Sequence, residues 1–143
     1  MRAVLIGAGI ALIAGLGYWA IETQDKAPVG EQTTEGGTAI ANVTVPKALT
    51  TNAEIGRTIY DAKCAICHGA DGEGQADVAP PLVHIIYEPS HHGDEAFQRA
   101  AAQGVRAHHW KFGDMPPVEG LTRGDVAMVV TYIRELQRAN KIN

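Results

Sequence analysis

The sequence predicts a small all-α domain that follows a long apolar segment at the N-terminus. Three observations predict this fold class. Apolar residues recur at helical spacing after residue 50, loops rich in Gly and Pro separate the helical stretches, and no stretch alternates like a β-strand. The chain has 143 residues, enough for about one domain, and its 45% hydrophobic content is ordinary for a globular protein.

The N-terminal segment, residues 3–21, reads AVLIGAGIALIAGLGYWAI and contains no charged residue. As a helix it would be about 28 Å long, close to the hydrocarbon thickness of a bilayer. Arg2 precedes the segment and Glu22 follows it, so the positive-inside rule places the rest of the chain outside the cytoplasm. We expect residues 1–21 to be a transmembrane anchor, with a cleaved signal peptide as the alternative.

Residues 22–50 are rich in Thr, Gly, Ala and Glu, and they contain no aromatic residue and no helical period. This composition predicts a flexible linker. The folded domain is then expected at residues 51–143.

Three helices are expected in this domain. Thr51 and Glu54 form a capping-box pattern, and Ile55, Ile59 and Ala62 follow at helical spacing. A second helix is expected over residues 94–103. The last helix is expected to begin at Thr122, which forms a capping box with Asp125. Its apolar side is made of Val126, Val129, Val130, Ile133 and Leu136.

Both cysteines of the chain lie in the segment AKCAICHGADGEGQ, residues 62–75. Cys64, Cys67 and His68 form a C-x-x-C-H pattern, which is the attachment pattern of c-type haem. Two cysteines on one turn can each bond a vinyl group of the same porphyrin, and the next residue places an imidazole against the iron. Covalent haem would also supply apolar bulk that so small a domain needs.

A C-x-x-C pair can also serve as a redox dithiol or as part of a zinc site. A thioredoxin-like dithiol requires a βα context, which the sequence does not show. A zinc site requires four ligands, so Cys64 and Cys67 would have to recruit two histidines from the pairs at 91–92 and 108–109.

Residues 51–143 as a whole resemble class I c-type cytochromes, including bacterial membrane-attached members. Gly56 and Tyr60 look like the small and aromatic pair on the first helix of that family. Val129 and Tyr132 look like the pair on the last helix that crosses it. The resemblance implies a cytochrome c fold wrapped on one covalent haem c, with His68 as an axial ligand of the iron.

The same resemblance suggests further site residues. The GDMPP loop, residues 113–117, looks like the loop that carries the sixth iron ligand, here Met115. A histidine at 108 or 109 is the alternative ligand. Pro80 and Leu82 match the P-x-L pattern of the family, which implies that the Pro80 carbonyl accepts a hydrogen bond from His68.

Several neighbouring residues complete this prediction. Trp110 and Phe112 are expected to wall the haem pocket. His84 stands where many relatives have glycine. Lys111, with Arg106 second, is the basic residue expected to meet an acidic redox partner.

The function implied is that of a membrane-tethered monohaem cytochrome c. It would carry single electrons between respiratory complexes on the periplasmic side of a bacterial inner membrane, as a single-pass protein. The expected partners are a quinol–cytochrome c reductase and a terminal oxidase; the net charge of −4 argues against nucleic acid. Two strong axial ligands leave the iron no open position, so we expect an electron-transfer protein and not an enzyme.

Two alternatives differ in class from this carrier. The first is a fixed haem c subunit of a single oxidoreductase complex. The second is copper binding by the paired histidines at 91–92 and 108–109.

Overall fold

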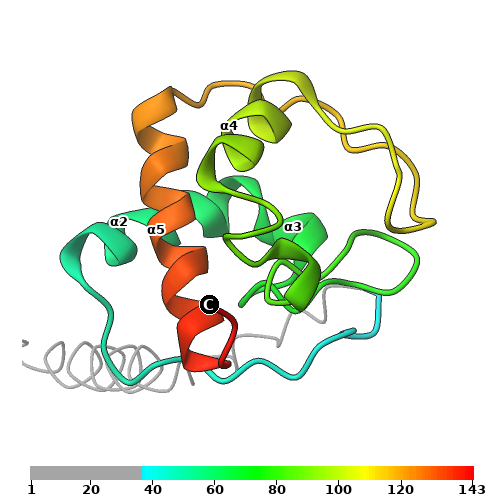
Figure 1. The fold of residues 1–143 in the computed structure, drawn as a ribbon. Helices are drawn as coiled ribbons and strands as arrows, with labels where there is room; N and C mark the ends of the chain where they lie inside the picture. Colours follow the sequence, from blue (N-terminus) through cyan, green and yellow to red (C-terminus); the bar gives the residue numbers. More distant parts are fainter. Residues whose placement is uncertain (1–36) are drawn as a thin grey trace, which may run out of the picture. The chain divides into compact units, whose positions relative to one another are not determined.

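The computed structural model describes residues 37–143, and the expected anchor at 1–21 lies outside the described residues. Its helices are α2 (Thr51–Lys63), α3 (Ala65–His68), the 3-10 helix η1 (Ile85–Tyr87), α4 (Asp94–Gln103) and α5 (Arg123–Ala139) (Figure 1). Within residues 37–143, β-pairing is limited to isolated bridges, which confirms the all-α fold class. In this part of the chain no helix has both the length and the apolar character needed to cross a membrane.

The core of the domain lies where α2 crosses α5. Gly56 is buried in α2, and a side chain added there would collide with the Met128 carbonyl of α5. One turn later, the Tyr60 ring packs against Tyr132 with ring centroids 5.4 Å apart, and both side chains are fully buried. The absence of a side chain at Gly56 therefore lets the two helices approach closely, and the crossing pairs implied by the resemblance are confirmed.

The buried face of α2 differs from the predicted one. Ala53, Gly56 and Tyr60 are buried, and of the predicted side chains only Ile59 packs against the core, whereas Ile55 is 48% exposed and Ala62 is also exposed. The close approach at Gly56 decides which side of α2 faces α5. The larger apolar side chain of Ile55, one position away, therefore stays exposed.

The cap of α2 also differs from the predicted one, by one residue. The N-cap is Thr50 and not Thr51, because the Thr50 hydroxyl accepts the backbone N–H of Ala53. The same hydroxyl donates to the Glu135 carboxylate of α5 at 2.6 Å, which favours Thr50 over its neighbour.

Residues 37–50, expected to be flexible linker, belong to the folded domain. The Asn140 side chain donates to the Thr44 carbonyl and accepts from the Thr44 N–H, at 2.9 and 2.8 Å. Three apolar side chains of the segment pack against the core: Val43, Val45 and Leu49. The domain therefore extends at least from residue 37, and the boundary at 51 was placed too late because an extended packed segment carries no helical period.

Helices α4 and α5 form where the sequence predicts them. α4 covers the predicted residues 94–103 and ends at Gly104, whose φ is 75°. At the start of α5, the Thr122 side chain accepts the Asp125 N–H and the Asp125 carboxylate accepts the Thr122 N–H, which is the predicted capping box. Between these helices the chain runs out and back as a long loop (Figure 1).

Candidate haem-binding site

A cavity of about 570 Å³ lies among α3, α4, α5 and the loop that follows α4. This volume is within the range of small-molecule and cofactor sites. Its walls are mostly apolar and include Leu82, Phe97, Val105, Val126, Val130 and Ile133. All six site residues predicted from the sequence line this one cavity: Cys64, Cys67, His68, Pro80, Trp110 and Met115.

Cys64 and Cys67 are brought together by the turn between α2 and α3. Cys64 caps α2 by donating its N–H to the Tyr60 carbonyl at 2.7 Å, and it then accepts the N–H of His68 at 2.9 Å. Burial, followed by the charge of the neighbouring Cys67, raises the pKa of Cys64 to about 11. A thiol with a raised pKa is a poor nucleophile, because reactive cysteines have lowered pKa values. The environment of Cys64 therefore argues against a catalytic dithiol.

His68 is buried in the cavity wall and held in one orientation. Its Nδ1 lies 2.9 Å from the Pro80 carbonyl oxygen, the hydrogen bond that the resemblance implies. If Nδ1–H donates to this carbonyl, Nε2 keeps its lone pair for a metal ion. Burial lowers the pKa of His68, and the bond to Pro80 opposes part of that effect. The imidazole is thus kept in the neutral form that metals bind.

Met115 lines the same cavity from a loop with a fixed backbone. Its N–H donates to the Val105 carbonyl and its carbonyl accepts from the Val105 N–H, both at 2.9 Å. A side chain at Gly104 would collide with the Met115 carbonyl, and the φ of 75° there also favours glycine. Two prolines follow Met115, so its position in the wall is well defined.

Trp110 and Phe112 wall the cavity as expected, with stacked rings whose centroids are 5.7 Å apart. The indole Nε1 of Trp110 is buried and meets no hydrogen-bond acceptor within residues 37–143. An unpaired buried donor costs about 1–3 kcal/mol, so most such groups have a partner. A candidate acceptor is the Tyr87 hydroxyl: burial raises the pKa of Tyr87, and an interaction with the Trp110 indole opposes part of that effect.

Sequence reasoning missed two buried polar residues of α5, Arg134 and Gln137, which hydrogen-bond the backbone of segments that line the cavity. Arg134 is 7% exposed, and it donates to the Tyr87 and His92 carbonyls at 2.7 and 2.6 Å. Gln137 donates to the Leu82 carbonyl at 2.9 Å. The burial of Arg134 could have been predicted from its place in the helix, because it follows Val130 by four residues and so lies on the apolar side.

The histidine pairs at 91–92 and 108–109 come together beside the cavity, and His92, His108 and His109 contribute to its lining. Partial desolvation lowers the pKa of His109, and the nearby His108, His92 and His91 lower it further.

Comparison with known proteins gives one matching family and two similar proteins. Residues 53–137 match the family Cytochrome c. The chain is 32% identical to thiosulfate dehydrogenase of Psychrobacter arcticus over 105 residues, which are 71% of this chain and 31% of that protein. It is 37% identical to the Cbb3-type cytochrome c oxidase subunit CcoP of Cereibacter sphaeroides over 83 residues, 57% of this chain and 26% of that subunit. The matched regions thus span less than a third of either relative.

The first of these relatives corrects one prediction. We expected the protein not to be an enzyme, and similarity to a thiosulfate dehydrogenase contradicts that expectation. The family match and the similarity to CcoP support electron transfer by a cytochrome c domain, with haem c as the implied cofactor. Because the family match covers more than half of the sequence and agrees with the helical fold, the chain belongs to the cytochrome c family.

Proposed function

We propose that this protein is a monohaem cytochrome c that passes single electrons between respiratory proteins on the periplasmic side of a bacterial inner membrane. The observation that carries the proposal is the meeting of Cys64, Cys67, His68 and Met115 in one largely apolar cavity. A haem c bound there would supply one-electron chemistry through the ferric and ferrous states of its iron.

Each residue has a distinct role in this proposal. Cys64 and Cys67 hold the porphyrin through thioether bonds, and His68 and Met115 are the axial ligands. The Pro80 carbonyl fixes the tautomer of His68, because it lies 2.9 Å from Nδ1. A thioether ligand favours a higher reduction potential than a second imidazole does.

The unpaired donor of Trp110 supports the fit of this cofactor. Haem carries two propionate carboxylates, and a carboxylate is a strong acceptor for a buried N–H. The apolar walls suit the porphyrin plane, and Trp110 Nε1 could turn from its interaction with Tyr87 to a propionate.

Attachment to the membrane is the second part of the proposal. Residues 1–21 would be a single-pass anchor, and residues 37–50, part of the expected linker, pack on the haem domain. The mature chain should begin at or beside Met1 and should stay in the membrane fraction after a high-salt wash. A mature N-terminus at or after Tyr18 would instead show a cleaved signal peptide.

The similarity to CcoP favours a second candidate, a fixed haem subunit of one oxidoreductase complex. A mobile carrier would exchange electrons with both a quinol–cytochrome c reductase and a terminal oxidase, and it would separate from each in mild detergent. A fixed subunit would co-elute with one complex in constant stoichiometry. Purification in mild detergent followed by haem staining of the fractions distinguishes the two.

A further inference from the structure

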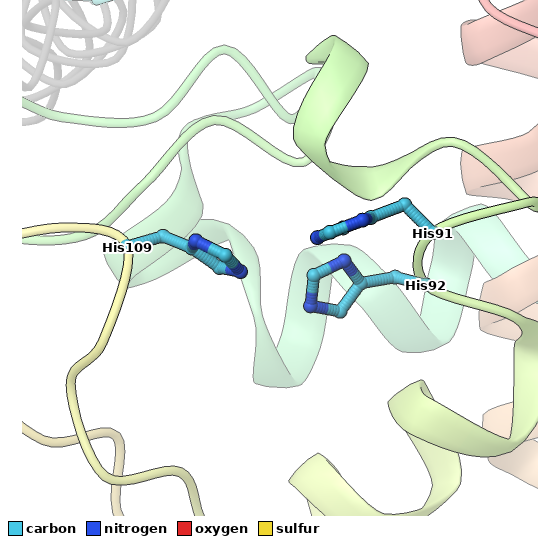
Figure 2. A group of neighbouring side chains, drawn as sticks. All are labelled: His91, His92 and His109. Carbon is cyan, nitrogen blue, oxygen red and sulfur yellow. The ribbon is translucent and has the colours of Figure 1, made fainter.

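Of the five histidines without a part in the proposed electron transfer, four lie close together: His91, His92, His108 and His109. They lie on two loops, one directly before α4 and one after it. Figure 2 shows His91, His92 and His109 turned toward one another from these loops. The helix between the loops therefore brings together histidines that are far apart in the sequence.

Three of these side chains have the spacing of a metal site. One ring nitrogen from each of His91, His92 and His109 lies within 4.8 Å of the other two. Around a tetrahedral zinc ion with Zn–N bonds of about 2.0 Å, ligand nitrogens are about 3.3 Å apart. The rings must therefore close by roughly 1–1.5 Å. Rotation of the exposed side chains of His91 and His109 can supply this movement.

His92 is the member of this trio whose ring is held by a hydrogen bond to the backbone. Its Nδ1 lies 2.6 Å from the Ile86 carbonyl oxygen and can donate a proton to it. Nε2 is then free to bind a metal, and a metal-binding histidine commonly has such a carbonyl partner on its other nitrogen. The His92 ring also packs on Tyr87, with centroids 5.1 Å apart.

Both loops are anchored close to the trio. The buried Arg134 donates to the His92 carbonyl at 2.6 Å, which fixes the loop before α4. After α4, the Asp114 carboxylate accepts the Ala107 N–H at 2.8 Å. The distance between the loops is thus set by the fold.

The ligand set selects the kind of ion. Imidazole nitrogens suit copper, zinc and nickel, whereas magnesium and calcium prefer oxygen ligands. The Irving–Williams order places copper(II) above zinc(II) in affinity at a site of nitrogen ligands. A fourth position can be taken by water or by His108, whose ring centroid lies 4.3 Å from that of His109.

We propose that His91, His92 and His109 form a binding site for one divalent transition-metal ion, with copper(II) bound more tightly than zinc(II). A bound ion would join the loop before α4 to the loop that carries Met115. Since both loops line the cavity, the ion would also brace the cavity wall. Its three ligands differ from His68 and Met115, the proposed iron ligands, although His92 and His109 line the same cavity.

The test uses the full chain with its haem attached, first treated with a chelator. Zinc(II) titrated in a calorimeter should bind at one ion per chain, and His91→Gln and His109→Gln should each weaken binding at least tenfold. His84→Asn is the matched control, because asparagine can still accept the Ile86 N–H that His84 Nδ1 accepts. An unchanged haem absorption spectrum shows that each variant is folded.

Copper(II) and thermal unfolding give independent readouts. The electron paramagnetic resonance spectrum of bound copper(II) should show coupling to three nitrogens, or to four if His108 also binds, with one fewer in His91→Gln. Zinc should raise the unfolding temperature of the wild type but not that of the variants, because an ion that binds only the folded state stabilises it. Equal zinc affinity in the wild type and the His91→Gln/His109→Gln double variant would overturn the proposal. So would an equal loss of affinity in His84→Asn.

Discussion

His68 and Met115 reach the same cavity through different local structures. His68 ends a single helical turn and is oriented by the Pro80 carbonyl, whereas Met115 is held by paired backbone hydrogen bonds to Val105. The imidazole is thus oriented through its side chain, and the thioether is positioned through its backbone. Substitution of Met115 should therefore remove a ligand without disturbing the loop that carries it.

The substitution Met115→Ala tests whether the Met115 side chain binds the iron without supporting the structure of its loop. The variant should keep its covalent haem, and its reduction potential should fall because the thioether ligand is lost. Carbon monoxide should then bind the ferrous variant much faster than the wild type. Potentiometry and rapid mixing measure the two effects.

Met128→Leu is the matched control, because it conserves side-chain volume in α5 and should leave the potential nearly unchanged. If carbon monoxide binds wild type and Met115→Ala at the same rate, Met115 is not a ligand, and variants of His108 and His109 become the next test.

At the scale of elements, the crossing of α2 and α5 depends on Gly56. Gly56→Ala should lower the free energy of unfolding by about 1–3 kcal/mol, because the new methyl group would collide with the Met128 carbonyl. Gly124→Ala in α5 is the control. Its methyl group would meet only the Thr122 hydroxyl at 3.6 Å, so it should stabilise by up to about 1 kcal/mol. Urea unfolding followed by circular dichroism measures both, and equal effects would show that the crossing tolerates a side chain.

The capping box of α5 predicts a pH effect. Hydrogen bonds from the Thr122 N–H and hydroxyl lower the pKa of Asp125 in the folded state. Its unfolded pKa is about 3.9, so the stabilisation is present above that pH and is lost as the pH falls through the lower folded value. Asp125→Asn should therefore be less stable than wild type at pH 6, and the difference should shrink near pH 3. A constant difference in unfolding midpoint across this range would exclude a charge effect.

The sequence predicted helices better than it predicted their packing. The bounds of α4 and the cap of α5 follow from local signals, a glycine stop and a Thr–Asp box, and both agree with the structure. The buried face of α2 depends instead on the distant Met128 carbonyl, which no local pattern encodes. The packing of residues 37–50 is likewise a long-range effect, because it depends on Asn140 near the C-terminus.

In the candidate site, too, the residues with a local sequence pattern were predicted and those placed by long-range packing were not. Cys64, Cys67 and His68 were recognisable because their spacing is local, and Met115 was found by its Gly/Pro loop. Arg134 was not recognised, because a charged residue is expected on the solvent side of a helix until its carbonyl partners are known. The sequence suggested copper binding by the two histidine pairs, but the grouping of His91 and His92 with His109 depends on the loops around α4.

At the scale of the whole molecule, we expect exposed charge near the cavity to steer the approach of redox partners. Lys111 is exposed and stands between Trp110 and Phe112, which both line the cavity. Lys111→Glu should slow electron transfer to an acidic partner by roughly two- to tenfold at low salt and leave the potential nearly unchanged. The effect should shrink at 0.1 M salt, where exposed charges are screened beyond about 10 Å.

Lys47→Glu provides the control for Lys111→Glu, because it makes the same charge change at an exposed residue that is not part of the cavity lining. Stopped-flow rates at several salt concentrations should separate the two variants. A faster reaction in Lys111→Glu would place the docking surface on the acidic side of the domain.

We expect this chain to carry one haem, bound covalently through Cys64 and Cys67. Intact-mass spectrometry of the chain produced in a host with cytochrome c maturation tests it most directly. We predict a mass equal to the polypeptide plus one haem, and haem absorbance that stays with the chain after denaturation and solvent extraction. Cys64→Ala/Cys67→Ala should lose that covalent mass. A wild-type chain with no added mass, or with haem that extraction removes, would contradict the claim.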